Sequence, residues 1–165
     1  MLYNPTDTTV KLAGMSLQRW TGTLGTSFAK LSFGQEDTIP AYSYFLIGLS
    51  SVSNRDDTFP STTFISTSNM GVALMRNTET IISGDTDKID AVAFGAGPEG
   101  EGTQITSLST NGYFAVRKVT QNANVLTGIY GGNELHWAGN YYDQGDNATD
   151  FVRRTSGPAQ APRGR

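Results

Sequence analysis

The sequence predicts an all-β protein that folds as one antiparallel β-sandwich. Its apolar runs are short, rich in Val, Ile, Phe and Tyr, and separated by Gly, Pro, Asn or Asp at about the 8–12 residue spacing typical of sandwiches. The 165 residues suffice for a single core, because a chain of about this length buries roughly 70% of its unfolded surface. The chain contains no Cys, so no disulfide is available to support the fold.

The elements follow from the apolar runs in chain order. Alternation of side chains along a strand places Val72 and Leu74 on one face, and Met15 and Leu17 share a face in the same way. These residues are the expected core. The predicted strands are Val10–Ala13, Ser16–Trp20, Phe28–Phe33, Tyr42–Ile47, Val72–Arg76, Thr80–Ile82, Ile89–Phe94, Tyr113–Val119, Leu135–Trp137 and Asp150–Arg154.

Two boundaries follow from composition. Residues 1–154 are predicted to form the sandwich, and residues 155–165 an extended basic tail with too few apolar residues to offset the entropy of ordering. The polar, irregular segment Leu49–Met70 is predicted to be a loop over one end of the sandwich.

The net charge of −3 argues against nucleic acid as a partner. No run of eighteen apolar residues exists, so we expect no membrane span.

The chain contains a series of short motifs. The chain opens with Leu2-Tyr3-Asn4, then Val10–Gly14 closes on Leu-x-Gly, and Leu17-Gln18 follows. Further motifs are Ile39-Pro40-Ala41, Tyr44–Ile47, Gly71–Leu74, Asp90–Gly95, Arg117-Lys118, Asp146–Phe151 and Ser156-Gly157-Pro158. In this order over residues 2–158, the set resembles the lamin-tail domain of secreted bacterial proteins.

The resemblance implies an immunoglobulin-like sandwich that acts outside the cell, as a structural or adhesive module and not as an enzyme. The sequence departs from the family in two places. The family's opening strand is missing ahead of Leu2, and residues 120–142 form an insert where the family has a short link. No secretion leader follows Met1, so we expect that a leader was removed or that the recorded start is late.

The two departures suggest self-assembly. A sandwich that lacks a strand exposes a groove of unpaired backbone groups, here beside Leu2 and Tyr3, and such edges accept strands from elsewhere. The insert contains an apolar run of strand length that carries Val125, Leu126, Ile129 and Tyr130. If this run fills the groove of a second copy, the chain is a surface or filament subunit. The run could equally form an ordinary hairpin within its own chain.

A second hypothesis is an accessory domain that positions a secreted enzyme on polysaccharide or nucleic acid. Trp137, Tyr141 and Tyr142 are the candidate binding aromatics, because such rings stack on sugars at surfaces. They could equally fill the core. A neighbouring catalytic domain in the full-length gene would favour this hypothesis over the subunit.

The residues for bond chemistry are sparse. His136 is the single histidine, and without a partner acid or Cys it lacks what a nucleophile requires, so we predict no enzymatic activity. Asp143, Asp146 and Asp150 are spaced loosely enough for oxygen-ligated calcium, the one candidate cofactor. Asp side chains also cap turns through the backbone, which is the alternative for all three.

Overall fold

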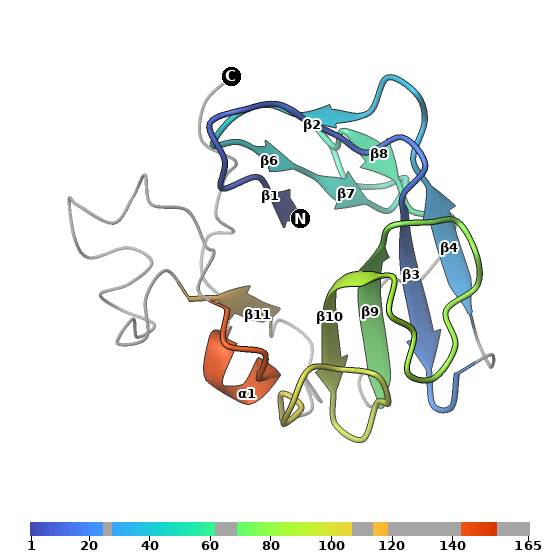
Figure 1. The fold of residues 1–165 in the computed structure, drawn as a ribbon, viewed down its shortest axis with the longest axis vertical. Coiled ribbons are helices and arrows are strands. Elements are labelled where there is room, and N and C mark those ends of the chain that lie inside the picture. Colours follow the sequence, from blue (N-terminus) through green and yellow to red (C-terminus); the bar gives the residue numbers. More distant parts are fainter. Residues whose placement is uncertain (25–27, 62–68, 107–113, 119–142, 155–165) are drawn as a thin grey trace.

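The computed structural model describes residues 1–24, 28–61, 69–106, 114–118 and 143–154. Within these ranges the regular structure is almost entirely strand, with a single short helix (Figure 1). The prediction of an all-β protein is therefore confirmed.

The main sheet has four antiparallel strands in the order β10-β9-β3-β4. Its members are β3 (Ser16–Thr21), β4 (Ala29–Ser32), β9 (Met70–Met75) and β10 (Lys88–Phe94). Four of the predicted strands correspond to them. The register places Leu17 opposite both Leu31 and Leu74, so one apolar row crosses three strands.

Short strands form a second layer beside the ends of β3 and β4 (Figure 1). Two pairs are antiparallel, and the third is parallel. They are β1 (Leu2–Tyr3) with β6 (Tyr44–Phe45), β2 (Val10–Lys11) with β5 (Thr38–Ile39), and β7 (Ile47–Gly48) with β8 (Asp57–Thr58).

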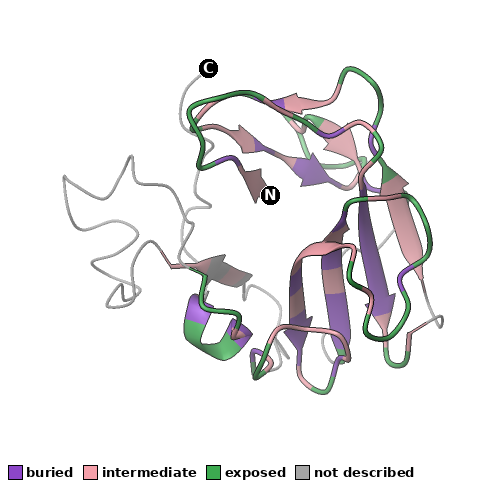
Figure 2. Cartoon of the chain, in the orientation of Figure 1, coloured by how far each residue is buried: buried purple, intermediate pink, exposed green. Residues whose placement is uncertain are grey.

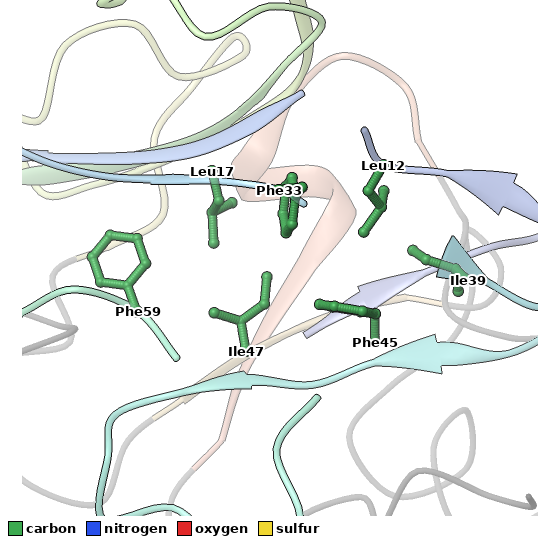
Figure 3. Close-up of a cluster of buried hydrophobic side chains, with 7 residues drawn as sticks. All are labelled: Leu12, Leu17, Phe33, Ile39, Phe45, Ile47 and Phe59. Atoms are coloured by element: carbon green, nitrogen blue, oxygen red, sulfur yellow. The ribbon is translucent and has the colours of Figure 1, made fainter. Parts of the chain in front are cut away.

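The main core lies between these two layers. Figure 3 shows Leu12, Leu17 and Phe33 facing Ile47 and Phe45 across it. Ile39 and Phe59 complete the buried set, and Val72 and Leu74 pack against it as alternation predicts. Burial of each large apolar side chain contributes about 1.5–3 kcal/mol, which makes this cluster the main source of stability in the described part.

The opposite face of the main sheet carries Trp20, Ala73, Met75 and Ala91, and Ile81 covers them from a connecting segment. Figure 2 shows the resulting burial along β3, β9 and β10. Gln18 attaches this segment to the sheet. Its Nε2 donates to the carbonyl oxygen of Glu79, and its Oε1 accepts the N–H of Ile81 at 2.9 Å.

The strand predicted over Thr80–Ile82 is wrong, because a side chain takes the place of a partner strand there. The strand predicted over Tyr42–Ile47 is split. The backbone of Leu46 bonds to Asp56 instead, donating to Oδ2 at 2.7 Å and accepting from its N–H at 2.8 Å.

Other predicted elements differ in their bounds. The strand predicted over Val10–Ala13 keeps two residues, as β2. The predicted loop Leu49–Met70 includes β8 and supplies Phe59, which is 1% exposed, to the core. The predicted strand Leu135–Trp137 lies outside the described residues.

The C-terminal unit, as we call residues 114–118 and 143–154, contains β11 (Phe114–Arg117), α1 (Asn147–Asp150) and β12 (Phe151–Arg154). β11 and β12 pair antiparallel. The strand predicted from Asp150 starts one residue later, because Asp150 ends α1. Ala115 and Phe151 pack against Met70, Phe94 and Ile105, which joins the unit to the main sheet.

Candidate functional site

Charged side chains gather where the C-terminal unit meets β10. The guanidinium of Arg117 lies 2.6 Å from Oδ1 of Asp90 on β10, 3.4 Å from Oδ1 of Asp143 and 3.9 Å from Oδ2 of Asp150. The guanidinium carbon of Arg117 lies over the ring of Phe151, 4.5 Å from the ring centroid. We call Arg117, Asp90, Glu101, Asp143 and Asp150 the Arg117 cluster.

Local hydrogen bonding fixes the acids of α1. Asp150 is fully buried, and its carboxylate accepts the N–H groups of Gln144 at 3.0 Å and Asp146 at 3.1 Å. Asp146 is the N-cap, and its carboxylate accepts the N–H groups of Thr149 and Thr103, both at 2.9 Å. These backbone bonds lower the pKa of Asp146 to about 2.

Asn147 joins α1 to the outer edge of β10. Its carboxamide Oδ1 accepts the N–H of Ala93 at 2.9 Å, and its Nδ2 donates to the carbonyl oxygen of Ala91 at 2.9 Å. Oδ1 also accepts the N–H of Glu101 at 3.2 Å. One fully buried side chain thereby makes the two bonds that a neighbouring strand would make.

Glu101 brings a buried oxygen, Oε2, into the cluster, and this atom has no hydrogen-bond partner. Burial raises the pKa of Glu101 to about 7. The charges of Asp90 and Asp143 act in the same direction, while Arg117 and a hydrogen bond with the backbone of Ala91 oppose them. Burial also raises the pKa of Asp90, against the effect of Arg117. The cluster therefore holds more negative charge than its one guanidinium neutralises.

The three acids predicted to bind calcium have other partners. Asp146 and Asp150 accept backbone N–H groups, and Oδ1 of Asp143 accepts the N–H of Gly145 at 3.0 Å. Across the residues that the structure describes, no group of three or more His, Asp or Glu is arranged to hold a metal ion. The capping role, which the sequence left open, accounts for the observed bonds.

The other predicted site residues divide into two sets. Leu2 and Tyr3 form β1, which pairs with β6, and the rings of Tyr3 and Tyr44 lie 4.7 Å apart. Leu2 packs against the main core. Outside the described residues lie Val125, Leu126, Ile129, Tyr130, His136, Trp137, Tyr141 and Tyr142.

Sequence reasoning missed the roles of Asn147, Glu101 and Arg117. Arg117 and Asp90 belong to two of the short motifs of the sequence, but 26 residues separate the two in the chain. Only the packing of β11, α1 and β12 against the β10 edge brings them together. The Asp-rich composition around Asn147 was the available signal, and it indicated capping as well as metal binding.

Comparison of the chain with models of protein families, with curated proteins and with solved structures gave no match. In the described part of the chain, no helix is long and apolar enough to cross a membrane.

Proposed function

We propose that this chain is a non-enzymatic structural or adhesive module that acts outside a bacterial cell. In this proposal it is an immunoglobulin-like sandwich of the lamin-tail kind. Copies associate by pairing β-strands at exposed sheet edges, so its mechanism is backbone hydrogen bonding and surface contact instead of bond chemistry.

The observation that carries the proposal is the outer edge of β4. This strand ends the main sheet, and no described strand pairs with its far side. The N–H of Phe33 donates to the carbonyl oxygen of Met15 at 3.1 Å. Because such bonds alternate along an antiparallel pair, the backbone groups of Lys30 and Ser32 point away from β3. Such an edge can accept a further strand.

The contrast with β10 supports the same proposal. The outer edge of β10 is occupied by Asn147 and by Ile105, whose N–H donates to Ala93 at 3.0 Å. One end of the main sheet is therefore covered by the chain's own residues, while the other end has no strand beside it among the described ranges. A single free edge can pair with the same edge of a second copy as a two-fold dimer, and open head-to-tail growth would need a second, different surface of the partner as well.

A proline on β4 tests the proposal. Ser32→Pro removes an N–H that points outward, so the pairing of β4 with β3 is retained while the edge is blocked. We expect the purified wild type to show assemblies by light scattering and electron microscopy, and Ser32→Pro to reduce them at least several-fold. Ser32→Ala is the matched control and should assemble like the wild type. A strictly monomeric, well-folded wild type would contradict the proposal.

A further inference from the structure

The contact between the C-terminal unit and β10 combines an ion pair, a carboxamide bridge and a small apolar cluster. We propose that the Arg117 cluster is a proton-operated latch, which holds the C-terminal unit on the β10 edge in mild acid and loosens that contact as the pH rises. The latch would operate whether or not copies of the chain assemble.

Polar contacts carry much of the docking. Arg117 reaches Asp90 across the junction at 2.6 Å, and Asn147 reaches Ala91 and Ala93. Thr103 adds an N–H donated to Asp146 at 2.9 Å. Among the residues that the structure describes, the apolar part of the junction consists of the cluster of Met70, Phe94 and Ile105 with its neighbours. A change in electrostatics at the cluster therefore acts on a large share of what holds the unit.

The charges around Glu101 and along the junction come from every segment that packs there, and those of Asp90, Asp143 and Arg117 act on Glu101 itself. Asp90 lies on β10, Asp143 precedes α1, Asp150 ends α1, and Arg117 ends β11. Asp146, the N-cap, accepts N–H groups that lower its pKa to about 2, so it stays ionised in mild acid. Nearby Lys88 is paired with Glu99 at 2.9 Å. Among the ion pairs of the described residues, Arg117 is the single cation joined to these acids.

Glu101 is the group that responds to pH in the neutral range. Its buried Oε2 has no hydrogen bond, and the backbone of Ala91 and the charge of Arg117 compensate a negative charge on the carboxylate only in part. When Glu101 ionises, a further charge appears beside Asp90 and Asp143, both of which pair with the same guanidinium. Repulsion among these carboxylates then opposes the docked state.

The direction of the effect follows from linkage. The pKa of Glu101 is about 7 in the docked state, against an ordinary value of 4.5 when the group is solvated. The docked state therefore binds the proton more tightly, so docking is strongest below pH 4.5 and weakens as the pH rises through about 7. Because solvent screens a half-buried group, we expect a change in the docking equilibrium of about tenfold.

Amide hydrogen exchange of the full chain tests the latch. Three amides report on the junction, those of Ala93, Glu101 and Thr103, since each donates to Asn147 or Asp146. Rates are measured by NMR at about pH 5 and about pH 8 and corrected for the intrinsic effect of pH on exchange. We expect the protection of these amides to fall about tenfold at the higher pH, while amides of β3 keep theirs.

Two variants complete the test. Glu101→Gln is nearly isosteric and cannot ionise, so the protection of the junction amides should become independent of pH. Glu36→Gln removes an exposed carboxylate elsewhere and should behave like the wild type. Equal loss of protection in β3, no loss at the junction, or an unchanged pH response in Glu101→Gln would each overturn the latch. Circular dichroism at both pH values confirms that the variants are folded.

Discussion

The indole of Trp20 lies against Gly71, the residue opposite it on the neighbouring strand, so closely that a Cβ atom on Gly71 would overlap the ring. Trp20 is fully buried, and its Nε1 donates to the carbonyl oxygen of Pro98 at 3.2 Å. The ring thus joins β3 and β9 to the segment that follows β10. The absence of a side chain at Gly71 is what lets the ring occupy this position.

Gly71→Ala should be strongly destabilising. The added methyl group meets ring atoms of a fully buried tryptophan with no free space, so either the strand or the ring must shift. We expect a loss of about 3 kcal/mol in the free energy of unfolding, at the upper end for an added core methyl group, measured by urea denaturation. Gly34→Ala is the control, because a Cβ there makes an ordinary contact of 3.5 Å with Asp37. If Gly71→Ala were no worse than the control, the packing described for Trp20 would be incorrect.

Asn147→Ala should uncover the β10 edge. It leaves the N–H of Ala93 and the carbonyl oxygen of Ala91 without the partners that Asn147 supplies. Buried unsatisfied groups cost about 1–3 kcal/mol each, so we expect the free energy of unfolding to fall by about 2–6 kcal/mol in total, with faster exchange of the Ala93 amide.

Asn147→Asp should be no better than Asn147→Ala, since a carboxylate accepts from Ala93 but cannot donate to Ala91. The control is Ala148→Ser, at an exposed position of the same helix. Wild-type stability in Asn147→Ala would show that the carboxamide is not what closes this edge.

Stability should also fall in strong acid. Hydrogen bonds from Ser83 and Lys88 lower the pKa of Glu99 to about 2, from an ordinary value of 4.5. The contribution of ionised Glu99 to the free energy of unfolding is therefore present above pH 4.5 and is lost as the pH falls toward 2. The pH dependence for Glu101 has the opposite sign, because its raised pKa makes docking strongest in acid and weaker as the pH rises.

Glu99→Gln should reduce the acid loss. Between about pH 5 and pH 2.5 we expect the melting temperature of the variant to fall less than that of the wild type, by about 2–4 °C, which is roughly 1 kcal/mol for a domain of this size. Glu36→Gln should follow the wild-type curve. Parallel curves for the wild type and Glu99→Gln would contradict the assigned role of Glu99.

The strands of the main sheet could be predicted because their apolar alternation is local. Leu17, Val72 and Leu74 face the main core as their spacing indicates. The shorter elements could not be, since tertiary contacts decide them. The side chain of Gln18 accepts the N–H of Ile81, so this β-prone segment is a loop and not a strand. The carboxylate of Asp56 accepts the N–H of Leu46, which interrupts the predicted strand there. Neither interaction leaves a pattern in neighbouring residues.

The Arg117 cluster was beyond prediction for a related reason. Its members come from four segments of the chain. The interactions among their charges depend on burial and on distances that the sequence does not give. A raised pKa such as that of Glu101 follows from surroundings that composition does not specify. The three residues predicted as calcium ligands accept backbone N–H groups in the structure.

The carboxamide of Asn147 has a consequence for how far the main sheet can grow. A further strand at this edge would have to replace the two bonds of Asn147 to Ala91 and Ala93 and the backbone bonds of Ile105 to Ala93 and Gly95. Two residues that are distant in the sequence therefore set the boundary of the sheet on that side. Substitution of Asn147 would remove the side-chain half of this boundary and leave the backbone half in place.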